Sequence, residues 1–460
     1  RRAYTMGKSK GPAASGLAGG LAAALAGATG GGGGGGTNMS LASALGSAVD
    51  SIDSESQMLL KRLGKRDTVT KMKALAELKE ALGTKPAEWA AELLPHWAVA
   101  FGRLSDDVSW QVREQTCAVL CAFAGVVRRQ LGPQLKTLIA PWLCCKFDPN
   151  SNVKLAASAA FDAALPNPGK YADALAFCRE ELVRALGDAA IDTKPPGKAA
   201  DKEEEAEAAE AYARRVGSAL LGLAHLLGTD SKGLAPPDAP LAQLLQDHIL
   251  HKPALWRLGG AKQPAVRAAL FGMALAVLQH VPSLVAEVVQ PLSSTLLDAL
   301  SATDASTHGA LWDPLLLLLR DHPAALQLQS PRPSHVLARL LSLLRHGCYG
   351  AAPTVAEALL PLVAQLPSEM LAPADGGATA PAAQLLPALI EGLSSEALAV
   401  AHMPALLKAH GELLQLLLVC AAPSGVAPQL QLLRDALTPT VSALLDGTLP
   451  PRLAERDACV

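Results

Sequence analysis

The feature that most constrains the fold is a series of amphipathic helical segments that begins near residue 52 and continues along the chain. In residues 71–82, Leu75, Leu78 and Leu82 follow a spacing of three or four residues, which places them on one face of a helix. Further segments of 12–20 residues repeat this pattern between Pro, Gly and Asp residues. No stretch alternates like a strand, so we predict an all-α fold.

Composition supports this prediction. Half of the 460 residues are hydrophobic but only 3% are aromatic, and Ala and Leu, which favour helices, dominate. This composition argues against an all-β fold and against a chain that is disordered throughout. A net charge of −2 excludes a uniformly basic nucleic-acid binder, although residues 1–150 carry 18 basic and 12 acidic side chains. A surface that faces a polyanion is therefore expected near the N-terminus.

A turn signature recurs in residues 105–113, 147–154 and 261–267. In each, Asp, Asn or Pro opens a turn and a Val-Arg or Val-Lys pair follows at the start of a helix. Arg113 and Lys154 are 41 residues apart, within the length of a HEAT repeat. We predict a HEAT/ARM-like α-solenoid of stacked antiparallel helix pairs, in which the Val packs inward and the cation reaches an acid of an adjacent turn.

Changes in composition divide the chain into four parts. Residues 1–50 contain a run of glycines and are predicted to form a disordered Gly/Ala-rich tail. Residues 51–187 are predicted to form a first HEAT-like domain, and residues 212–460 to continue the helical repeats. Residues 188–211 between them are assigned to an acidic loop, with the start of a charged helix as the alternative. No secretory signal and no membrane span are predicted.

The sequence contains no pattern of a catalytic or metal site. A phosphate-binding P-loop and a nucleophile elbow are both absent. None of the eight cysteines is spaced Cys-x-x-Cys, and we interpret them as small buried thiols. His248 and His251 could supply two metal ligands from one helix, but no third ligand follows, and surface histidines are the better interpretation. We therefore predict no catalytic residue, no metal ligand and no cofactor in this chain.

One basic cluster is the best candidate for a binding site. It comprises Lys61, Arg62, Lys65, Arg66, Lys71 and Lys73, with only Asp67 opposing them. On one helix, Lys61/Lys65 and Arg62/Arg66 would be repulsive pairs at i,i+4, which a partner with negative charge would offset. That partner would be rRNA phosphate or an acidic protein, and a solvated basic face is the alternative. Because no aromatic residues are interleaved, a contact with RNA would be to the backbone.

Several segments then resemble a known family in order and spacing. They are LLKRLGKRDTVTKMKAL at 59–75, LPHW at 94–97, VRE at 112–114, LKTLIAPW at 135–142 and AAFDAALP at 159–166. Together they are similar to the N-terminal part of the listerin family of E3 ubiquitin ligases. The resemblance is specific over roughly 140 residues and thinner to about residue 320.

The resemblance implies a ribosomal function. Listerins are long HEAT/ARM-like solenoids of ribosome-associated quality control in the cytosol. Their N-terminal domain docks on the large (60S) ribosomal subunit and on the factor that recognises obstructed subunits. A C-terminal zinc-binding RING recruits the E2 and transfers ubiquitin to the stalled nascent chain.

This chain reaches Val460 without the paired Cys and His ligands of a RING. We therefore expect a monomeric part that binds but does not catalyse by itself, with zinc, E2 and ubiquitin belonging to the RING. The alternative from another class is a general HEAT/ARM scaffold or adaptor that binds protein partners only.

Overall fold

The structure is a computed structural model and describes residues 52–198, 201–230, 240–326, 334–372 and 380–445. Within these ranges the regular elements are α-helices, short 3₁₀ turns and one π-helical turn, and no strand occurs. The prediction of an all-α fold is therefore confirmed. The predicted disordered tail lies outside the described residues.

The chain divides into two compact units. The first combines Arg1–Tyr171 with Asp188–Arg215, and the second combines Ala172–Gly187 with Val216–Val460. The predicted boundary after residue 187 therefore differs from the observed one. The difference arises because the Ala172–Gly187 segment packs with the second unit. Gly187 lies so close to the Ile249 side chain that a Cβ added to it would be only 2.9 Å away.

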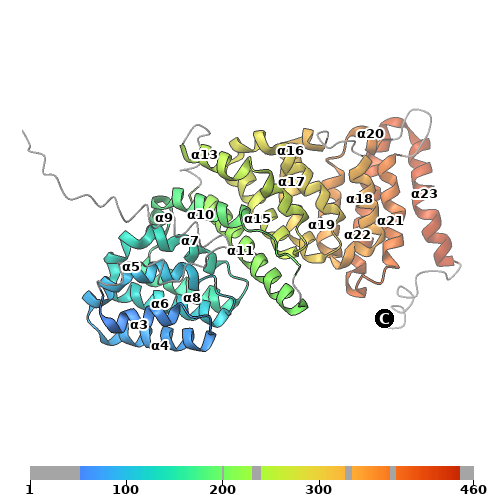
Figure 1. Cartoon of the computed structure of the whole chain (residues 1–460). Helices are drawn as coiled ribbons and strands as arrows, with labels where there is room; N and C mark the ends of the chain where they lie inside the picture. The colour runs from blue at the N-terminus through green and yellow to red at the C-terminus, as the bar shows by residue number, and fades with distance from the viewer. Residues whose placement is uncertain (1–51, 199–200, 231–239, 327–333, 373–379, 446–460) are drawn as a thin grey trace, which may run out of the picture. The chain divides into compact units, whose positions relative to one another are not determined.

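The first unit is a stack of antiparallel helix pairs. Its successive helices are α3 (Ser54–Leu63), α4 (Thr68–Thr84), α5 (Ala87–Leu104), α6 (Trp110–Val127), α7 (Leu135–Lys146) and α8 (Ser151–Ala164). Helix α6 packs between α4 and α8 in one layer, while α5 packs between α3 and α7 in the other (Figure 1). Because each helix contacts the helix two places along the chain, this arrangement is the predicted solenoid.

The few aromatic residues of this unit are concentrated between its layers. The ring of Trp97 lies 5.6 Å from that of Phe123, and Trp142 stacks on Phe161 at 3.8 Å. All four side chains are almost completely buried. The buried indole N–H of Trp142 donates to the carbonyl oxygen of Ala157 at 3.1 Å, so this large side chain is buried without losing its hydrogen bond.

Three helices run across the division between the units: α9 (Pro168–Phe177), α10 (Arg179–Ile191) and α11 (Lys202–Thr229). The 188–211 segment is therefore not a loop throughout, because helix covers both of its ends. Asp201 Oδ1 accepts a hydrogen bond from the backbone N–H of Glu203 at 3.1 Å, and acidic side chains fill the first turn of α11. Negative charge at a helix N-terminus is stabilising. The predicted loop assignment is therefore wrong over residues 188–191, which belong to α10, and over residues 202–211, where its alternative, a charged helix start, is right.

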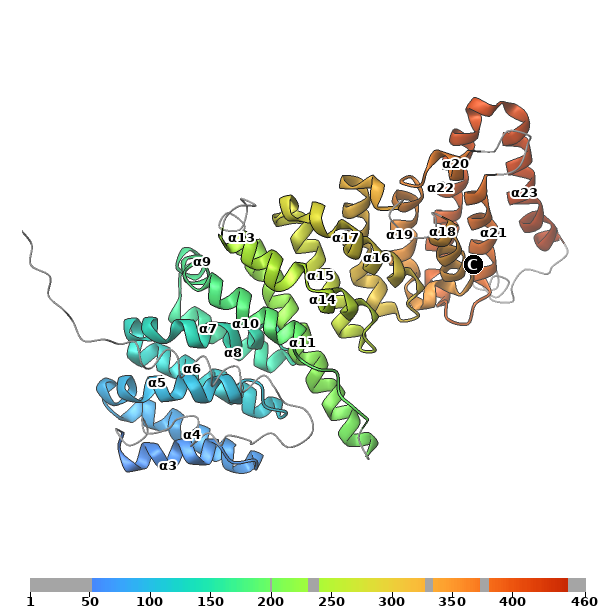
Figure 2. The same ribbon diagram turned by 45° about the horizontal axis from the view of Figure 1, so that its top comes forward.

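The second unit repeats the two-layer arrangement. Its remaining helices are α13 (Pro240–Leu245), α14 (Pro253–Arg257), α15 (Pro264–His280), α16 (Val285–Asp298), α17 (Ala305–Asp321), α18 (Ser334–Arg345), α19 (Ala352–Val363), α20 (Ser368–Leu371), α21 (Leu385–Leu393), α22 (Met403–Ala421) and α23 (Val426–Leu445). Helices α15, α17, α19 and α22 pack in succession, and α18 packs against the end of α16 and against α21 (Figure 2).

Apolar helices are frequent in the second unit. Among the described residues, Val400–Ala421 is long and apolar enough to cross a membrane by length and composition. Pro264–His280 and Pro282–Ser301 meet the same criterion only when taken together across a 104° bend. Of the apolar window of Val400–Ala421, 28% is buried, and Leu413 and Leu417 are among its buried residues. Core helices of globular proteins can meet this criterion too. The absence of a membrane span stays a prediction.

Candidate interaction surface

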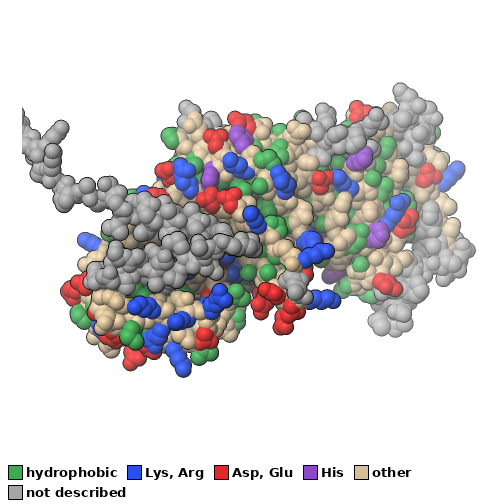
Figure 3. Space-filling view, viewed as in Figure 1, with side chains coloured by type: hydrophobic (Ala, Val, Ile, Leu, Met, Phe, Trp, Pro, Cys, Tyr) green, Lys and Arg blue, Asp and Glu red, His purple; other side chains and the backbone are tan. Residues whose placement is uncertain are grey.

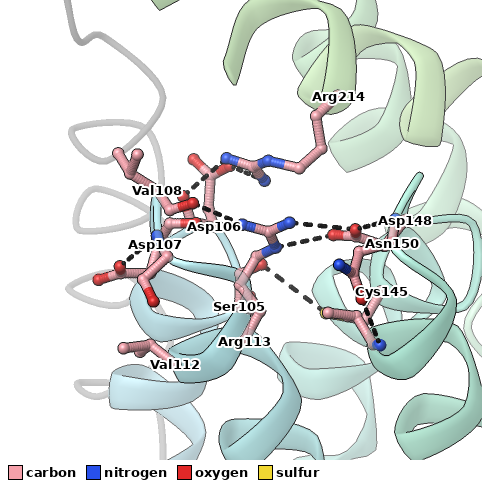
Figure 4. A network of polar contacts seen from close by, with 12 residues as sticks. Ser105, Asp106, Asp107, Val108, Val112, Arg113, Cys145, Asp148, Asn150 and Arg214 are labelled. Atoms are coloured by element: carbon pink, nitrogen blue, oxygen red, sulfur yellow. Dashed lines mark hydrogen bonds and ion pairs between the residues drawn. The ribbon is translucent and has the colours of Figure 1, made fainter. Parts of the chain in front are cut away.

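The turns that precede the helices of one layer are joined by buried charges. Arg113 donates through Nε and Nη2 to the two carboxylate oxygens of Asp148, at 2.8 and 3.1 Å (Figure 4). Its Nη1 also donates to the carbonyl oxygens of Asp107 and Val108, at 2.8 and 2.9 Å. Both charged side chains are at most 5% exposed. The predicted reach of this Arg to an acid of an adjacent turn is confirmed, and it fixes the turn before α6 to the turn before α8.

The same arrangement recurs in the second unit. Arg267 forms an ion pair with Asp304, and its Nε donates to Thr307 Oγ1 at 3.1 Å. Burial acts to raise the pKa of Asp304, but hydrogen bonds, chiefly from Thr307, lower it to about 2. The third predicted cation, Lys154, is exposed and has no side-chain partner among the described interactions. The valine that precedes each cation, Val112, Val153 or Val266, is fully buried as predicted.

The turn before α6 is held by three more basic side chains. Lys71 Nζ lies 2.5 Å from Asp107 Oδ2, and both side chains are largely buried. Arg214 of α11 donates to Asp106 Oδ1 at 2.8 Å and to its carbonyl oxygen at 3.0 Å. Arg215 forms a further ion pair with Asp106. The acids of this turn are therefore neutralised within the unit.

Two of the six predicted basic residues take part in such internal pairs. One is Lys71, and the other is Arg62, whose guanidinium forms a two-pronged contact with Glu77, with 2.8 Å between Nη1 and Oε1. The hydrogen bond with Arg62 lowers the pKa of Glu77. Glu77 and Asp107 therefore oppose the cluster in addition to Asp67, and neither was anticipated from the sequence.

The predicted repulsive pairs Lys61/Lys65 and Arg62/Arg66 do not lie on one helix. Helix α3 ends at Leu63, and the backbone N–H of Gly64 bonds to the carbonyl oxygen of Leu60 at 3.2 Å. Lys65 and Arg66 thus lie in the turn beyond the helix. Lys61 lies in the last turn of α3, where the helix dipole favours a cation without any partner.

An exposed basic group remains after these corrections. Lys61, Lys65 and Arg66 are exposed and have no acidic partner among the described interactions, and we call them the α3–α4 basic turn. Lys73 is exposed too, but its charge contributes to lowering the pKa of Asp67 and Glu77. Figure 3 shows several Lys and Arg side chains over α3 and α4, with acidic side chains at the lower edge.

Sequence reasoning missed a set of exposed apolar side chains at the start of α4, α6 and α8. Val69, Val108, Trp110 and Leu155 are all exposed there. The register of the turn signature contained the signal. Val112 and Val153 point inward. Trp110 lies two residues before Val112 and Leu155 two residues after Val153, and residues two apart on a helix point to nearly opposite sides, so Trp110 and Leu155 point outward.

The described residues contain no group of three or more His, Cys, Asp or Glu side chains that could hold a metal ion. His251 Nε2 instead lies 3.0 Å from a carboxylate oxygen of Glu287. Cys117 and Cys348 are fully buried, and burial raises the pKa of the Cys348 thiol to about 12. We assign no ligand and no nucleophile to the described residues.

Comparison with known proteins identifies related chains. Residues 50–366 match the family described as the N-terminal domain of the E3 ubiquitin-protein ligase listerin. Listerin of Mus musculus is 30% identical over 333 residues, which cover 71% of this chain and 18% of that protein. Listerin of Gallus gallus is 29% identical over 359 residues, which cover 76% and 19%. The chain thus corresponds to less than a fifth of the length of these relatives.

Solved structures with similar helical repeats were also found. A designed armadillo repeat protein is 16% identical, with a TM-score of 0.28 over 57% of this chain and 99% of that one. Importin beta is 12% identical, with a TM-score of 0.34 over 79% of this chain and 46% of that one.

Proposed function

Because the chain belongs to the listerin family of E3 ubiquitin-protein ligases and matches its N-terminal domain, we propose that it is the ribosome-docking part of a listerin-like ligase. In this role it brings the ligase to 60S subunits that carry a stalled nascent chain, which is then marked for degradation. The observation that carries the proposal is the family match over residues 50–366.

The surface chemistry supports docking at the N-terminal end of the chain. The α3–α4 basic turn presents three cations without internal partners, whereas the neighbouring acids Asp106, Asp107 and Asp148 are neutralised inside the first unit. Such a surface attracts phosphate or acidic protein and gives binding that weakens with salt. We propose Lys61, Lys65 and Arg66 as its contact residues, with Lys73 beside them.

Docking and ubiquitin transfer are assigned to different parts of the ligase. This part binds the large subunit and the factor that recognises obstructed subunits, in the cytosol. Recruitment of the E2, ubiquitin transfer and zinc binding belong to a RING. Since the chain spans 18–19% of the mouse and chicken relatives, their activity as ligases enters here as part of the proposal.

Charge reversal tests the contact residues. A variant with Lys61→Glu, Lys65→Glu and Arg66→Glu is compared with wild type for binding to purified 60S subunits in a sedimentation assay. A matched control reverses three other exposed cations of the first unit, Lys79, Arg129 and Lys170. We expect the basic-turn variant to lose at least tenfold in affinity and to show a shallower salt dependence.

The control is expected to stay within threefold of wild type. Equal binding by wild type and the basic-turn variant would remove these residues from the interface. If none of the three proteins sediments with 60S subunits, a general HEAT/ARM scaffold is the better description of the chain.

A further inference from the structure

The exposed apolar side chains of the first unit are concentrated along one edge. Its described residues have five large hydrophobic side chains that are exposed: Met58, Val69, Val108, Trp110 and Leu155. All but Met58 lie at or just before the N-terminal ends of α4, α6 and α8, which are neighbours in one layer. We call these four residues the turn ridge.

The turn ridge is rigid because the ion pairs beneath it hold its turns in a row. Lys71 at the start of α4 binds Asp107 in the next turn, and Arg113 at the start of α6 binds Asp148 in the turn after that. The carbonyl oxygen of Val108 accepts a hydrogen bond from Arg113, and its side chain points away from the Arg113–Asp148 pair (Figure 4). The Val108 side chain is therefore exposed although its turn is held by hydrogen bonds.

The degree of exposure is large for such residues. Val69, Val108 and Leu155 are 59%, 67% and 70% exposed, and Trp110 is 36% exposed. Single exposed apolar residues are normal on a protein surface, but a row of four on three neighbouring helices of one layer forms an apolar strip that a partner could cover. A partly exposed Trp at its middle is the residue type that most often anchors a binding interface.

The charge around the ridge selects the partner. The acids Asp107 and Asp148 are already paired within the unit. Lys65, Arg66 and Lys154 lie next to the ridge in sequence, and all three are exposed without an acidic partner among the described interactions. One exposed acid, Asp67, lies beside Arg66, so the border of the apolar strip carries a net positive charge, and an acidic partner complements it.

We propose that the turn ridge docks an extended, acidic polypeptide segment that carries two or three apolar side chains. Helices in a layer are about 8–10 Å apart, so the ridge spans roughly 20 Å from α4 to α8. An extended chain covers about 3.3–3.6 Å per residue, so six or seven residues cover the ridge. Aliphatic side chains offer nothing to phosphate, which is why a polypeptide fits this edge better than RNA.

The inference deepens the proposed function, on which it rests for its biological setting, by naming the chemistry of a protein partner at this end of the chain. To test it, peptides are selected from a random 12-residue phage-display library on the full 460-residue chain. We expect enriched peptides to combine negative net charge with at least two Leu, Ile, Val or aromatic residues. One enriched peptide is then synthesised with a fluorescent label for anisotropy titrations.

Matched variants locate the binding site of that peptide. Val108→Ser with Leu155→Ser removes two ridge side chains, and Met58→Ser with Val419→Ser removes two equally exposed apolar side chains outside it. We expect the ridge variant to weaken binding at least tenfold and the control less than twofold. Lys65→Glu with Arg66→Glu is expected to weaken binding at least threefold. A labelled 12-nucleotide oligouridine is expected to bind equally to wild type and the ridge variant.

Three results would overturn the inference. They are a selection that enriches no acidic apolar peptide, a peptide that binds the ridge variant as well as wild type, and oligouridine binding that depends on the ridge side chains. The outcome is separate from that of the proposed function. If the wild-type chain does not bind 60S subunits but binds the peptide through the ridge, the ribosomal setting is wrong and the ridge is still a peptide-binding site.

Discussion

At the scale of single residues, the buried ion pairs are the contacts on which the fold depends most. Arg113 is 5% exposed and uses three of its nitrogen atoms for Asp148 and the turn before α6. A buried charge whose partner is removed stays in a low-dielectric environment without compensation, which is strongly destabilising. The surface pair between Arg62 and Glu77 is exposed, so its contribution is small.

This contrast gives the first prediction. Asp148→Asn is expected to lower the free energy of unfolding by about 3–5 kcal/mol, because it leaves the Arg113 charge buried without its counterion. Glu77→Gln, the exposed control, is expected to leave the free energy of unfolding almost unchanged. Urea unfolding followed by circular dichroism measures both. Similar losses in the two variants would contradict the structural role of the buried pair.

His308 gives a prediction about pH. The side chain is fully buried, and its Nε2–H donates to the carbonyl oxygen of Ala302 at 2.8 Å. Burial lowers its pKa, although the contact with Ala302 opposes the shift. The unfolded chain therefore takes up a proton at a higher pH than the folded chain does. Stability should fall as the pH drops below about 6.5, by up to about 1.4 kcal/mol per pH unit for this residue, until the folded pKa is reached.

Comparison of wild type with His308→Gln isolates this contribution. Buried His96 and His410, whose pKa values burial also lowers, act equally in both proteins. We expect the urea midpoint of wild type to decrease more than that of the variant between pH 7.5 and pH 5.5. The same decrease in both proteins would show that His308 does not titrate as its burial implies.

Residue-level expectations from the sequence were right where local pattern decides the environment. Burial of Val112 and the ion pair of Arg113 follow from helix register and repeat spacing. The pairing of Arg62 with Glu77 was not foreseen, because it joins residues 15 positions apart on two helices. Which of several nearby cations finds such an acid depends on side-chain packing between helices.

At the scale of elements, the capping residues set where the helices begin. Asp67 accepts a hydrogen bond from the backbone N–H of Thr70 at 2.8 Å and so caps α4. Asp67→Ala is expected to lower the urea midpoint of unfolding, because Ala cannot accept this hydrogen bond. Asp67→Asn keeps a good capping side chain and is expected to lower the midpoint much less. Urea unfolding of both variants checks this, and equal losses would attribute the effect to charge.

Element boundaries were the least accurate part of the sequence interpretation. Gly64 ends α3 and Asp201 caps the N-terminus of α11. Gly is a known signal for the end of a helix and Asp for its start. Gly64 lies within the basic cluster and Asp201 at the start of an acidic run, so the interpretation followed the charges and not these two helix signals. The boundary between the units escaped prediction because α9, α10 and α11 each run across it without a break.

At the scale of the whole molecule, the chain combines a helical solenoid with membership of the listerin family. The helix periodicity was sufficient to predict the all-α architecture, because stacked helix pairs bury one face of each helix. The binding surfaces were predictable only in part, since exposure of the α3–α4 basic turn and the turn ridge depends on which neighbouring charges are already paired.

Selective docking on the large ribosomal subunit is best tested by co-sedimentation. The chain is incubated with purified 60S, 40S or 80S particles at a low and a physiological salt concentration, and the bound fraction is measured. We expect the chain to be retained on 60S particles in preference to the other two, and the bound fraction to decrease as salt rises. Equal retention on all three particles, or no retention on 60S at low salt, would contradict this expectation.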